Sequence, residues 1–209
     1  MLTALAGAGL TASLASCGAD DAHVAHDENP ASVSSSVDDG PYAGRELAEP
    51  QARPAFTLTD QSGTAFDFAA ETSGQPTLLF FGYANCPDVC PTTMADVALA
   101  LRSVPADVAA RTQVVFVTTD PARDTAHFLG SYLDRFDDGL PNPFIGLTGS
   151  QAEVEAAQEA AGVPLAEDDG TMHATSLYLF GTDDLARTVF SAGDTSAEIA
   201  QDLETIAAA

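Results

Sequence analysis

The chain has 209 residues, of which 31 are acidic and seven are arginine or lysine, so its formal net charge at pH 7 is −24. A chain of this length can hold one domain with a full hydrophobic core and still have residues for a leader and a tail. Phosphate backbones and anionic membrane surfaces repel such an acidic protein, which argues against nucleic-acid binding. Because the acidic residues are scattered, we interpret them as a solvated surface, with recognition of a basic partner as the alternative.

Residues 1–16 are expected to be a signal peptide. Residues 2–16 carry no charge and form an apolar stretch too short to span a bilayer comfortably. The stretch leads into Leu-Ala-Ser-Cys at residues 14–17, which resembles a bacterial lipoprotein box, although no basic residue precedes it. Such signals are cut before the cysteine, which then carries lipid. The resemblance predicts a mature protein anchored through Cys17 to the extracytoplasmic face of a bacterial membrane. A plain secretory signal is the alternative.

Residues 17–50 are expected to be a flexible tether that holds the following domain off the membrane. Ala, Ser, Asp, Gly and Pro dominate this stretch, and no apolar period persists in it. His23 and His26 lie among acidic residues and could form a weak accessory metal site. We favour the simpler interpretation, in which they are solvated histidines of a linker.

Residues 51–209 show the patterns of an α/β domain. Alternating apolar residues at 56–60 and 65–68, joined by a turn, predict a β-hairpin. Unbroken apolar runs at 77–82 and 113–118 predict strands that are covered on both faces. Further strands are expected at 144–147, 176–180 and 186–191, and helices at 92–103, 125–136, 150–161 (with a capping box from Ser150 to Glu153) and 196–207.

Cys86 and Cys90 are the only cysteines after Cys17, and they lie where the expected strand 77–82 gives way to a helix. A thiol at that place is exposed and close to the positive end of the helix. Pro91 suits the first position of that helix, where no amide hydrogen is needed. Across a three-residue spacer the two sulfurs can form a disulfide or bind one soft metal ion together. The spacing alone does not decide between redox chemistry and metal binding.

The order of the expected elements is that of a thioredoxin-like fold. A strand, the cysteine loop, a helix, a strand and a helix are followed by a terminal hairpin and helix. We therefore expect a central mixed sheet flanked by helices, with an N-terminal hairpin added. The right-handed crossover rule places Cys86 and Cys90 at the carboxyl end of a central strand, at an edge of the sheet where ligands commonly bind.

His173 is the candidate for a third ligand. It lies just before the expected strand 176–180, in a loop that a thioredoxin-like fold brings beside the cysteine loop. Two thiolates and one imidazole suit copper(I), whereas structural zinc takes four ligands. On its own, a histidine before a strand is usually an ordinary polar loop residue. Met94 falls at a core position and Met172 is only adjacent to His173, so neither methionine is expected to be a ligand.

Three motifs together resemble the Sco/SenC family of copper chaperones for cytochrome c oxidase. The motifs are Phe-x-Tyr-x-x-Cys-Pro-Asp-Val-Cys-Pro at 81–91, Asp-Pro-x-Arg-Asp at 120–124, and His173 ahead of Tyr-Leu at 178–179. They occur in the family's order and spacing. The resemblance implies that Cys86, Cys90 and His173 bind one copper ion per chain. It also implies that the partners are subunit II of cytochrome c oxidase and a copper donor protein. Many relatives have a transmembrane anchor, which the lipid on Cys17 would replace here.

The resemblance leaves two roles open. In the first, a membrane-tethered metallochaperone passes copper by ligand exchange to the binuclear copper site of the oxidase, without turning over a small substrate. In the second, the chain is an enzyme, a thiol-disulfide reductase that acts on the cysteines of subunit II. Thioredoxin-type oxidoreductases place a cis-proline before the strand that corresponds to 176–180, and this chain has no proline between residues 165 and 176. That difference favours the chaperone. A thiol peroxidase is a third alternative.

The other marked residues have structural explanations. Asp120, before a proline, is interpreted as the cap of the expected helix 125–136, and Arg123 as a partner for nearby acids. His127 is expected on the solvent face of that helix. Its neighbour Phe128 is expected in the core, because it follows the helical spacing of apolar residues.

Overall fold

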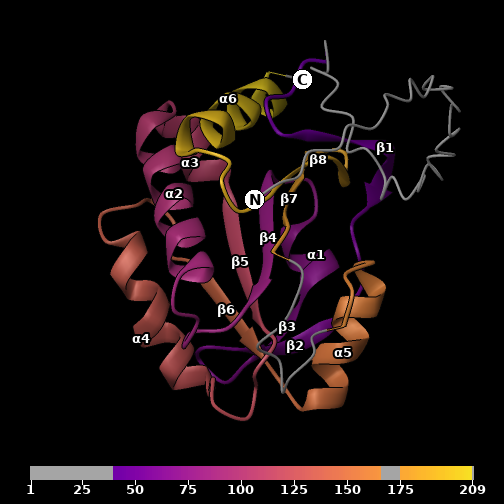
Figure 1. Ribbon diagram of the computed structural model, residues 1–209, viewed down its shortest axis with the longest axis vertical. Coiled ribbons are helices and arrows are strands. Elements are labelled where there is room, and N and C mark those ends of the chain that lie inside the picture. Colours follow the sequence, from indigo (N-terminus) through magenta and orange to yellow (C-terminus); the bar gives the residue numbers. More distant parts are fainter. Residues whose placement is uncertain (1–39, 166–174, 209) are drawn as a thin grey trace, which may run out of the picture. The chain divides into compact units, whose positions relative to one another are not determined.

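A computed structural model describes residues 40–165 and 175–208 of the chain. Figure 1 shows the strands and helices of these residues in chain order. The strands are β1 Arg45–Ala52, β2 Thr57–Asp60, β3 Ala65–Asp67, β4 Thr77–Gly82, β5 Gln113–Thr118, β6 Ile145–Thr148, β7 Leu177–Phe180 and β8 Leu185–Phe190. The helices are α1 Phe68–Thr72, α2 Val89–Ser103, α3 Ala106–Arg111, α4 Ala126–Asp137, α5 Gln151–Ala160 and α6 Ser196–Ala207. Among them, no helix is both long and apolar enough to cross a membrane.

The strands form one mixed sheet in the order β1-β8-β7-β4-β5-β6-β2-β3. The central strands β4, β5 and β6 are parallel to one another, and all other neighbours are antiparallel. The hairpin of β2 and β3 lies at one edge, next to β6. This arrangement confirms the expected mixed sheet, its N-terminal hairpin and the central place of the strand that precedes the cysteines.

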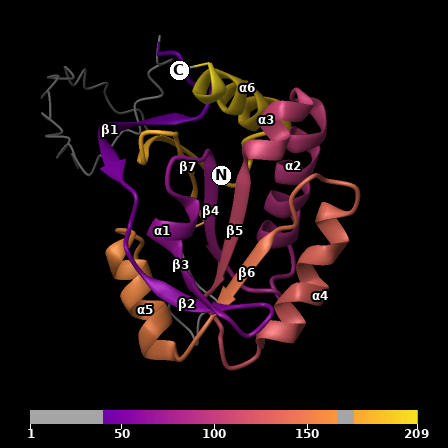
Figure 2. The same ribbon diagram turned by 180° about the vertical axis from the view of Figure 1, so that it is seen from behind.

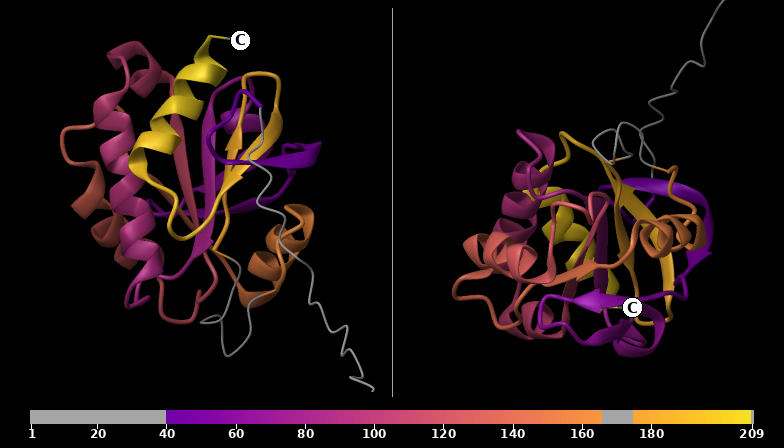
Figure 3. Two further views of the ribbon diagram at one scale, coloured as in Figure 1. Left: turned by 45° about the horizontal axis from the view of Figure 1, so that its top comes forward. Right: turned by 90° about the horizontal axis from the view of Figure 1, so that it is seen from below.

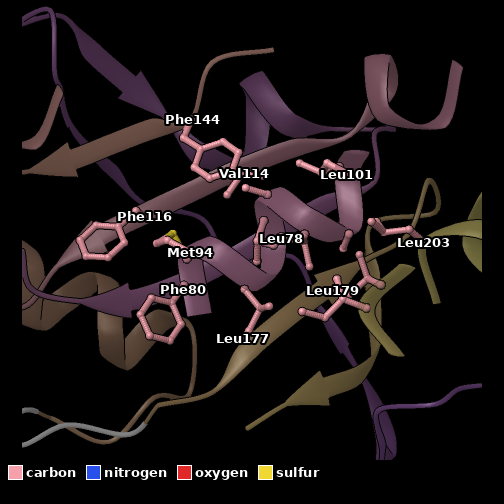
Figure 4. Close-up of a cluster of buried hydrophobic side chains, with 14 of the residues drawn as sticks. Leu78, Phe80, Met94, Leu101, Val114, Phe116, Phe144, Leu177, Leu179 and Leu203 are labelled. Atoms are coloured by element: carbon pink, nitrogen blue, oxygen red, sulfur yellow. The ribbon is translucent and has the colours of Figure 1, made fainter. Parts of the chain in front are cut away.

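Helices cover both faces of the sheet, as Figures 1 and 2 show from opposite sides. Helices α2, α3, α4 and α6 pack on one face, and α1 and α5 lie on the other. Successive residues of β4 alternate between the two cores, because side chains of a strand point to opposite faces. Phe80 belongs to the core under α2, which Figure 4 shows closely, and Phe81 to the core under α5. All six residues of β4 are buried, as the sequence predicted.

Several element boundaries differ from the expectation. Helix α2 begins at Val89, so Pro91 is its third residue and not its first. The first-turn amides of a helix have no intrahelical acceptor, so a proline is tolerated there as well. Thr125, not Asp120, caps α4, and its hydroxyl accepts a hydrogen bond from the amide of Phe128. The capping box of α5, from Ser150 to Glu153, is confirmed.

The expected end of the tether at residue 50 is wrong, because β1 already begins at Arg45 and pairs with β8. The preceding residues are also fixed to the domain. The carboxylate of Asp202 in α6 accepts hydrogen bonds from the amides of Ala43, at 2.6 Å, and Gly44, at 3.0 Å. The expected signal peptide and the rest of the tether lie outside the described residues.

Candidate metal centre

The two cysteines lie at the carboxyl end of β4, on the loop that leads into α2. The amide of Cys86 donates a hydrogen bond to the carbonyl oxygen of Tyr83 at 3.2 Å, which closes the loop into a tight turn. The amide of Cys90, in the first turn of α2, donates to the sulfur of Cys86 at 3.4 Å. Cys86 is half-buried and Cys90 is fully buried. The structure therefore brings the two predicted residues together, with Cys86 partly exposed and Cys90 held in the core.

The two thiols differ in acidity for physical reasons that the loop supplies. Burial raises the pKa of Cys86, but hydrogen bonds from the amides of Cys90 and Asp88 stabilise its thiolate. The net result is a pKa below that of an ordinary cysteine. Burial dominates at Cys90 and raises the pKa of its thiol far above the usual value, and the charges of Cys86 and Asp124 raise it further. The Cys86 thiol therefore ionises more readily than the Cys90 thiol, whose ionisation is opposed by burial.

Gly82, the last residue of β4, makes room for the buried thiol. A Cβ atom at this position would lie 2.9 Å from the sulfur of Cys90 and 2.6 Å from the ring of Phe80. Either distance is too short for a real contact, so any side chain here displaces the sulfur or the ring. Glycine at this position is therefore part of the site.

Asp124 connects the cysteine loop to the ends of two neighbouring strands. Its carboxylate oxygen Oδ2 accepts hydrogen bonds from the amide of Ala84 at 2.8 Å and from the hydroxyl of Thr118 at 2.7 Å. Its carbonyl oxygen accepts from the hydroxyl of Thr148 at the end of β6. Asp124 is fully buried, and burial raises the pKa of its carboxyl group above that of an ordinary aspartate. It fixes the start of the cysteine loop against the sheet.

Asp124 and Gly82 were missed as site residues by the sequence analysis. Asp124 stands in the Asp-Pro-x-Arg-Asp motif that was recognised, so its signal was present, but its contact with a loop 40 residues away is not visible in the sequence. In the sequence, Gly82 marks only the end of the apolar run 77–82. The neighbours that define both roles come from other elements.

The remaining candidates lie as follows. The side chain of Asp120 does not cap α4; it pairs with the guanidinium of Arg123, which confirms the expected acidic partner of that arginine. His127 is exposed on α4, as predicted. Phe128 is also exposed, at 43 %, so its expected place in the core is wrong. Met94 is fully buried in the core, as predicted.

His173 and Cys17 lie outside the described residues, as do His23, His26 and Met172. Within residues 40–165 and 175–208, no group of three His, Cys, Asp or Glu side chains could hold a metal ion. The described part of the site therefore consists of two sulfur donors. Two thiolates suit a soft ion such as copper(I), and they also suit a reversible disulfide.

Comparisons with known proteins identify the family to which the chain belongs. The family model described as SCO1/SenC matches residues 44–208. A protein of Stutzerimonas stutzeri named for copper binding is 37% identical over 66% of this chain and 68% of its own length. The mitochondrial protein SCO1 of Saccharomyces cerevisiae is 33% identical to this chain. The match covers 55% of this chain and only 37% of the yeast protein.

The structural comparison extends over most of the domain. The copper-bound structure of ScoI from Bradyrhizobium japonicum is 34% identical, with a TM-score of 0.62, and the match covers 75% of this chain and 99% of that one. The fold is thioredoxin-like, as the order of elements predicted. Because the family model covers well over half of the chain, this protein belongs to the SCO1/SenC family.

Proposed function

We propose that this protein is a copper metallochaperone that binds one copper ion through Cys86, Cys90 and His173. In this proposal it delivers the ion to the binuclear copper site of cytochrome c oxidase subunit II. The observation that carries the proposal is the pair of cysteines that follows β4. Cys86 is half-buried and Cys90 is buried, and the amide of Cys90 donates a hydrogen bond to the sulfur of Cys86. Membership of the SCO1/SenC family and the copper-bound relative support it.

The topology supports His173 as the third ligand. Strand β7 runs antiparallel to β4, so its first residues lie at the edge of the sheet where β4 ends. Thr175, two residues after His173, lines the same cavity as Asp88 and Val89 of the cysteine loop. Thr175 is the first described residue after His173, and its place beside the cysteine loop supports the proposed third ligand.

The two thiols suit transfer of copper by stepwise ligand exchange. Loading requires both cysteines as thiolates, and the metal supplies the stabilisation that the buried Cys90 lacks on its own. Unloading can begin at Cys86, because its half-buried sulfur is the one that a donor group of the partner can approach. The buried sulfur of Cys90 then leaves last, which keeps the ion bound until the partner holds it.

The proposed location is the extracytoplasmic face of a bacterial membrane, with lipid on Cys17 as the anchor. The uncharged residues 2–16 and the sequence Leu-Ala-Ser-Cys at 14–17 support this part of the proposal. The mass of the membrane-extracted protein tests it. A mature chain that begins at Cys17 and carries the added mass of lipid is expected, and an unmodified Cys17 contradicts it.

Substitution of the third ligand tests the metal site. We expect His173→Ala to lower the affinity for copper(I) at least about tenfold, because the loss of one of three ligands leaves a two-sulfur site. The Cys86–Cys90 disulfide should still form in the variant. Anaerobic copper titration of the reduced protein measures the affinity and the stoichiometry. His127→Ala, which removes an exposed histidine of α4, is the matched control and should bind copper like the wild type. Equal affinity of wild type and His173→Ala contradicts the three-ligand site.

A thiol-disulfide reductase is the second candidate function, and the different acidities of the two thiols favour it. Cys86 would attack a disulfide of subunit II, and its sulfur would form a mixed disulfide while the leaving sulfur takes a proton. Cys90 would then displace the second sulfur of the substrate, so that the pair is oxidised and the substrate reduced. Reduction of insulin at the rate of a thioredoxin favours this function, and His173→Ala should leave that rate unchanged.

A further inference from the structure

The cavity lined by Asp88, Val89 and Thr175 is a groove beside the cysteine loop, and neither Cys86 nor Cys90 is among its lining residues. Its walls are the first half of α2, the residues before and at the start of β7, and the connection from β8 to α6. Figure 3 shows α2 and α6 lying side by side, with the connection from β8 leading into α6. Asp88 and Val89 line the groove, and they follow Cys86 by two and three residues. Whatever occupies the groove therefore lies directly against the cysteine loop.

The size of the groove points to a protein side chain as the occupant. Its volume is about 210 Å³. Sites for small organic ligands are commonly about 300–1,000 Å³, so this groove is too small for most of them. A long side chain and its neighbour fit such a space.

The lining combines an apolar floor with an acidic rim. The floor is formed by Leu177, Phe190 and Ile199, which belong to three different elements. The rim carries the carboxylates of Asp88, Asp96 and Asp194. Among the described residues that line the groove there is no arginine, lysine or histidine. A lysine or arginine side chain is complementary to this lining, because its apolar stem can contact the floor while its charged end lies near the rim.

The carboxylates of Asp88 and Asp96 take part in none of the ion pairs found in residues 40–165 and 175–208. Asp194 accepts one hydrogen bond from the amide of Ser191 at 2.6 Å. Within the described part of the chain, no basic group therefore pairs with these carboxylates, and the rim keeps its negative charge. Negative charge on unpaired carboxylates attracts a cationic partner and raises the rate at which it associates.

We propose that this groove is the docking site for a cationic segment of the protein that exchanges copper with this chain, a segment with a lysine or arginine next to an apolar side chain. The inference rests on the proposed function for the identity of the process, but the docking itself does not require copper. Binding in the groove would hold the partner beside the half-buried sulfur of Cys86, where ligand exchange begins. The acidic residues of the rim would then attract the partner, while the scattered acidic residues elsewhere keep the surface solvated.

Two variants and one control separate the groove from the general charge of the chain. Asp96→Asn with Asp194→Asn removes two charges from the rim and keeps an oxygen to accept the hydrogen bond from Ser191. Ala192→Trp fills the groove without a change of charge. The control is Glu49→Gln with Glu159→Gln, which removes two charges from exposed residues of β1 and α5 outside the groove.

The probe is a fluorescein-labelled peptide of alternating lysine and leucine with blocked ends, and its binding to the reduced full chain is followed by anisotropy. We expect the rim variant and Ala192→Trp to weaken binding at least about fivefold, and the charge control to change it less than about twofold. Peptide binding to the rim variant should also depend less on salt concentration than binding to the wild type. Amide shifts in NMR spectra should locate the peptide at residues 88–96 and 190–194.

Equal weakening in the rim variant and the charge control overturns the proposal, because the peptide then responds only to the total charge. Equal binding of a peptide with glutamate in place of lysine, unchanged binding to Ala192→Trp, or no binding at millimolar peptide overturns it as well.

Copper titration of the same variants keeps the two proposals apart. If the wild type binds no copper while the peptide results hold, the proposed function fails and the docking site stands. If all variants bind copper but the groove variants bind the peptide like the wild type, the docking site fails alone.

Discussion

At the scale of single residues, the two cysteines of the site differ in burial and in the pKa of their thiols, although they are the same residue type. The amides of Cys90 and Asp88 stabilise the thiolate of Cys86, while burial opposes ionisation of Cys90. The backbone of the first turn of α2 thus acts on one thiol, and the hydrophobic core acts on the other. Gly82 belongs to the same arrangement, because the absence of its side chain leaves the space that the sulfur of Cys90 borders.

Gly82→Ala should destabilise the protein by about 1–3 kcal/mol and weaken copper binding, since the added methyl group overpacks the contact with Cys90 and Phe80. Urea denaturation of the reduced protein measures the first effect, and anaerobic copper titration measures the second. Gly130→Ala is the matched control. A Cβ at Gly130 of α4 meets only Gln61, at 3.4 Å, and alanine favours a helix, so this change should be neutral or stabilise by up to about 1 kcal/mol. A Gly82→Ala protein as stable as the wild type contradicts the packing argument.

At the scale of elements, Asp124 ties the cysteine loop to the ends of β5 and β6. The groups that it binds come from the loop after β4, from Thr118 of β5 and from Thr148 of β6. These three parallel strands end at one edge of the sheet, so a single carboxylate and its own backbone can reach all of them. The cysteine loop is therefore anchored from outside, at Ala84, as well as by its own turn.

Asp124→Ala should lower the free energy of unfolding by about 2–3 kcal/mol, because the amide of Ala84 and the hydroxyl of Thr118 lose their acceptor in a buried place. Relief of the buried carboxylate offsets part of this loss. Hydrogen exchange at the amide of Ala84 should become faster, which reports loosening of the loop itself. Asp107→Ala, at an exposed ion pair of α3, should change stability by less than about 0.5 kcal/mol. Unchanged exchange at Ala84 in Asp124→Ala would show that the loop does not depend on this carboxylate.

The elements also show where reasoning from local patterns succeeds and where it stops. Strands β4 and β5 were predicted with their bounds, because runs buried on both faces are apolar throughout. Strand β1 was missed, because it lies at the edge of the sheet and most of its residues are exposed, so that only its pairing with β8 defines it. Phe128 fits the helical period of apolar residues, yet it is exposed, because the buried face of α4 is formed by Leu129, Tyr132 and Leu133.

At the scale of the whole molecule, Asp202 of α6 joins the C-terminal helix to the residues that enter β1. The side chain is fully buried, and burial raises the pKa of its carboxyl group above that of an ordinary aspartate. Its two oxygens accept the amides of Ala43 and Gly44. The path of the chain into β1 is therefore set by a contact between residues near the two ends of the described chain.

Asp202 should make the stability of the protein depend on pH in a defined direction. Between the ordinary aspartate pKa, about 3.9, and the higher folded-state pKa, the folded protein binds more protons than the unfolded chain, so its stability falls as the pH rises. Asp202→Asn lacks this titration. The unfolding free energy of the wild type minus that of the variant should be largest below the ordinary pKa and decline as the pH rises through the folded-state pKa. Urea denaturation between about pH 3 and about pH 7 measures it, with Asp134→Asn, at an exposed residue, as the reference for the loss of one charge. A difference that is flat or rises with pH contradicts the argument.

The sequence by itself determined the fold class and the place of the two cysteines. Both follow from local physics, since apolar periodicity marks the buried strands and helices, and Cys86 and Cys90 follow one such strand directly. Only the tertiary structure decided that one sulfur is accessible and the other buried, that Asp124 fixes their loop, and that a groove with an acidic rim lies beside them. These properties arise where strands, helices and loops distant in sequence meet, and burial and hydrogen bonding at such places depend on neighbours that no local pattern specifies.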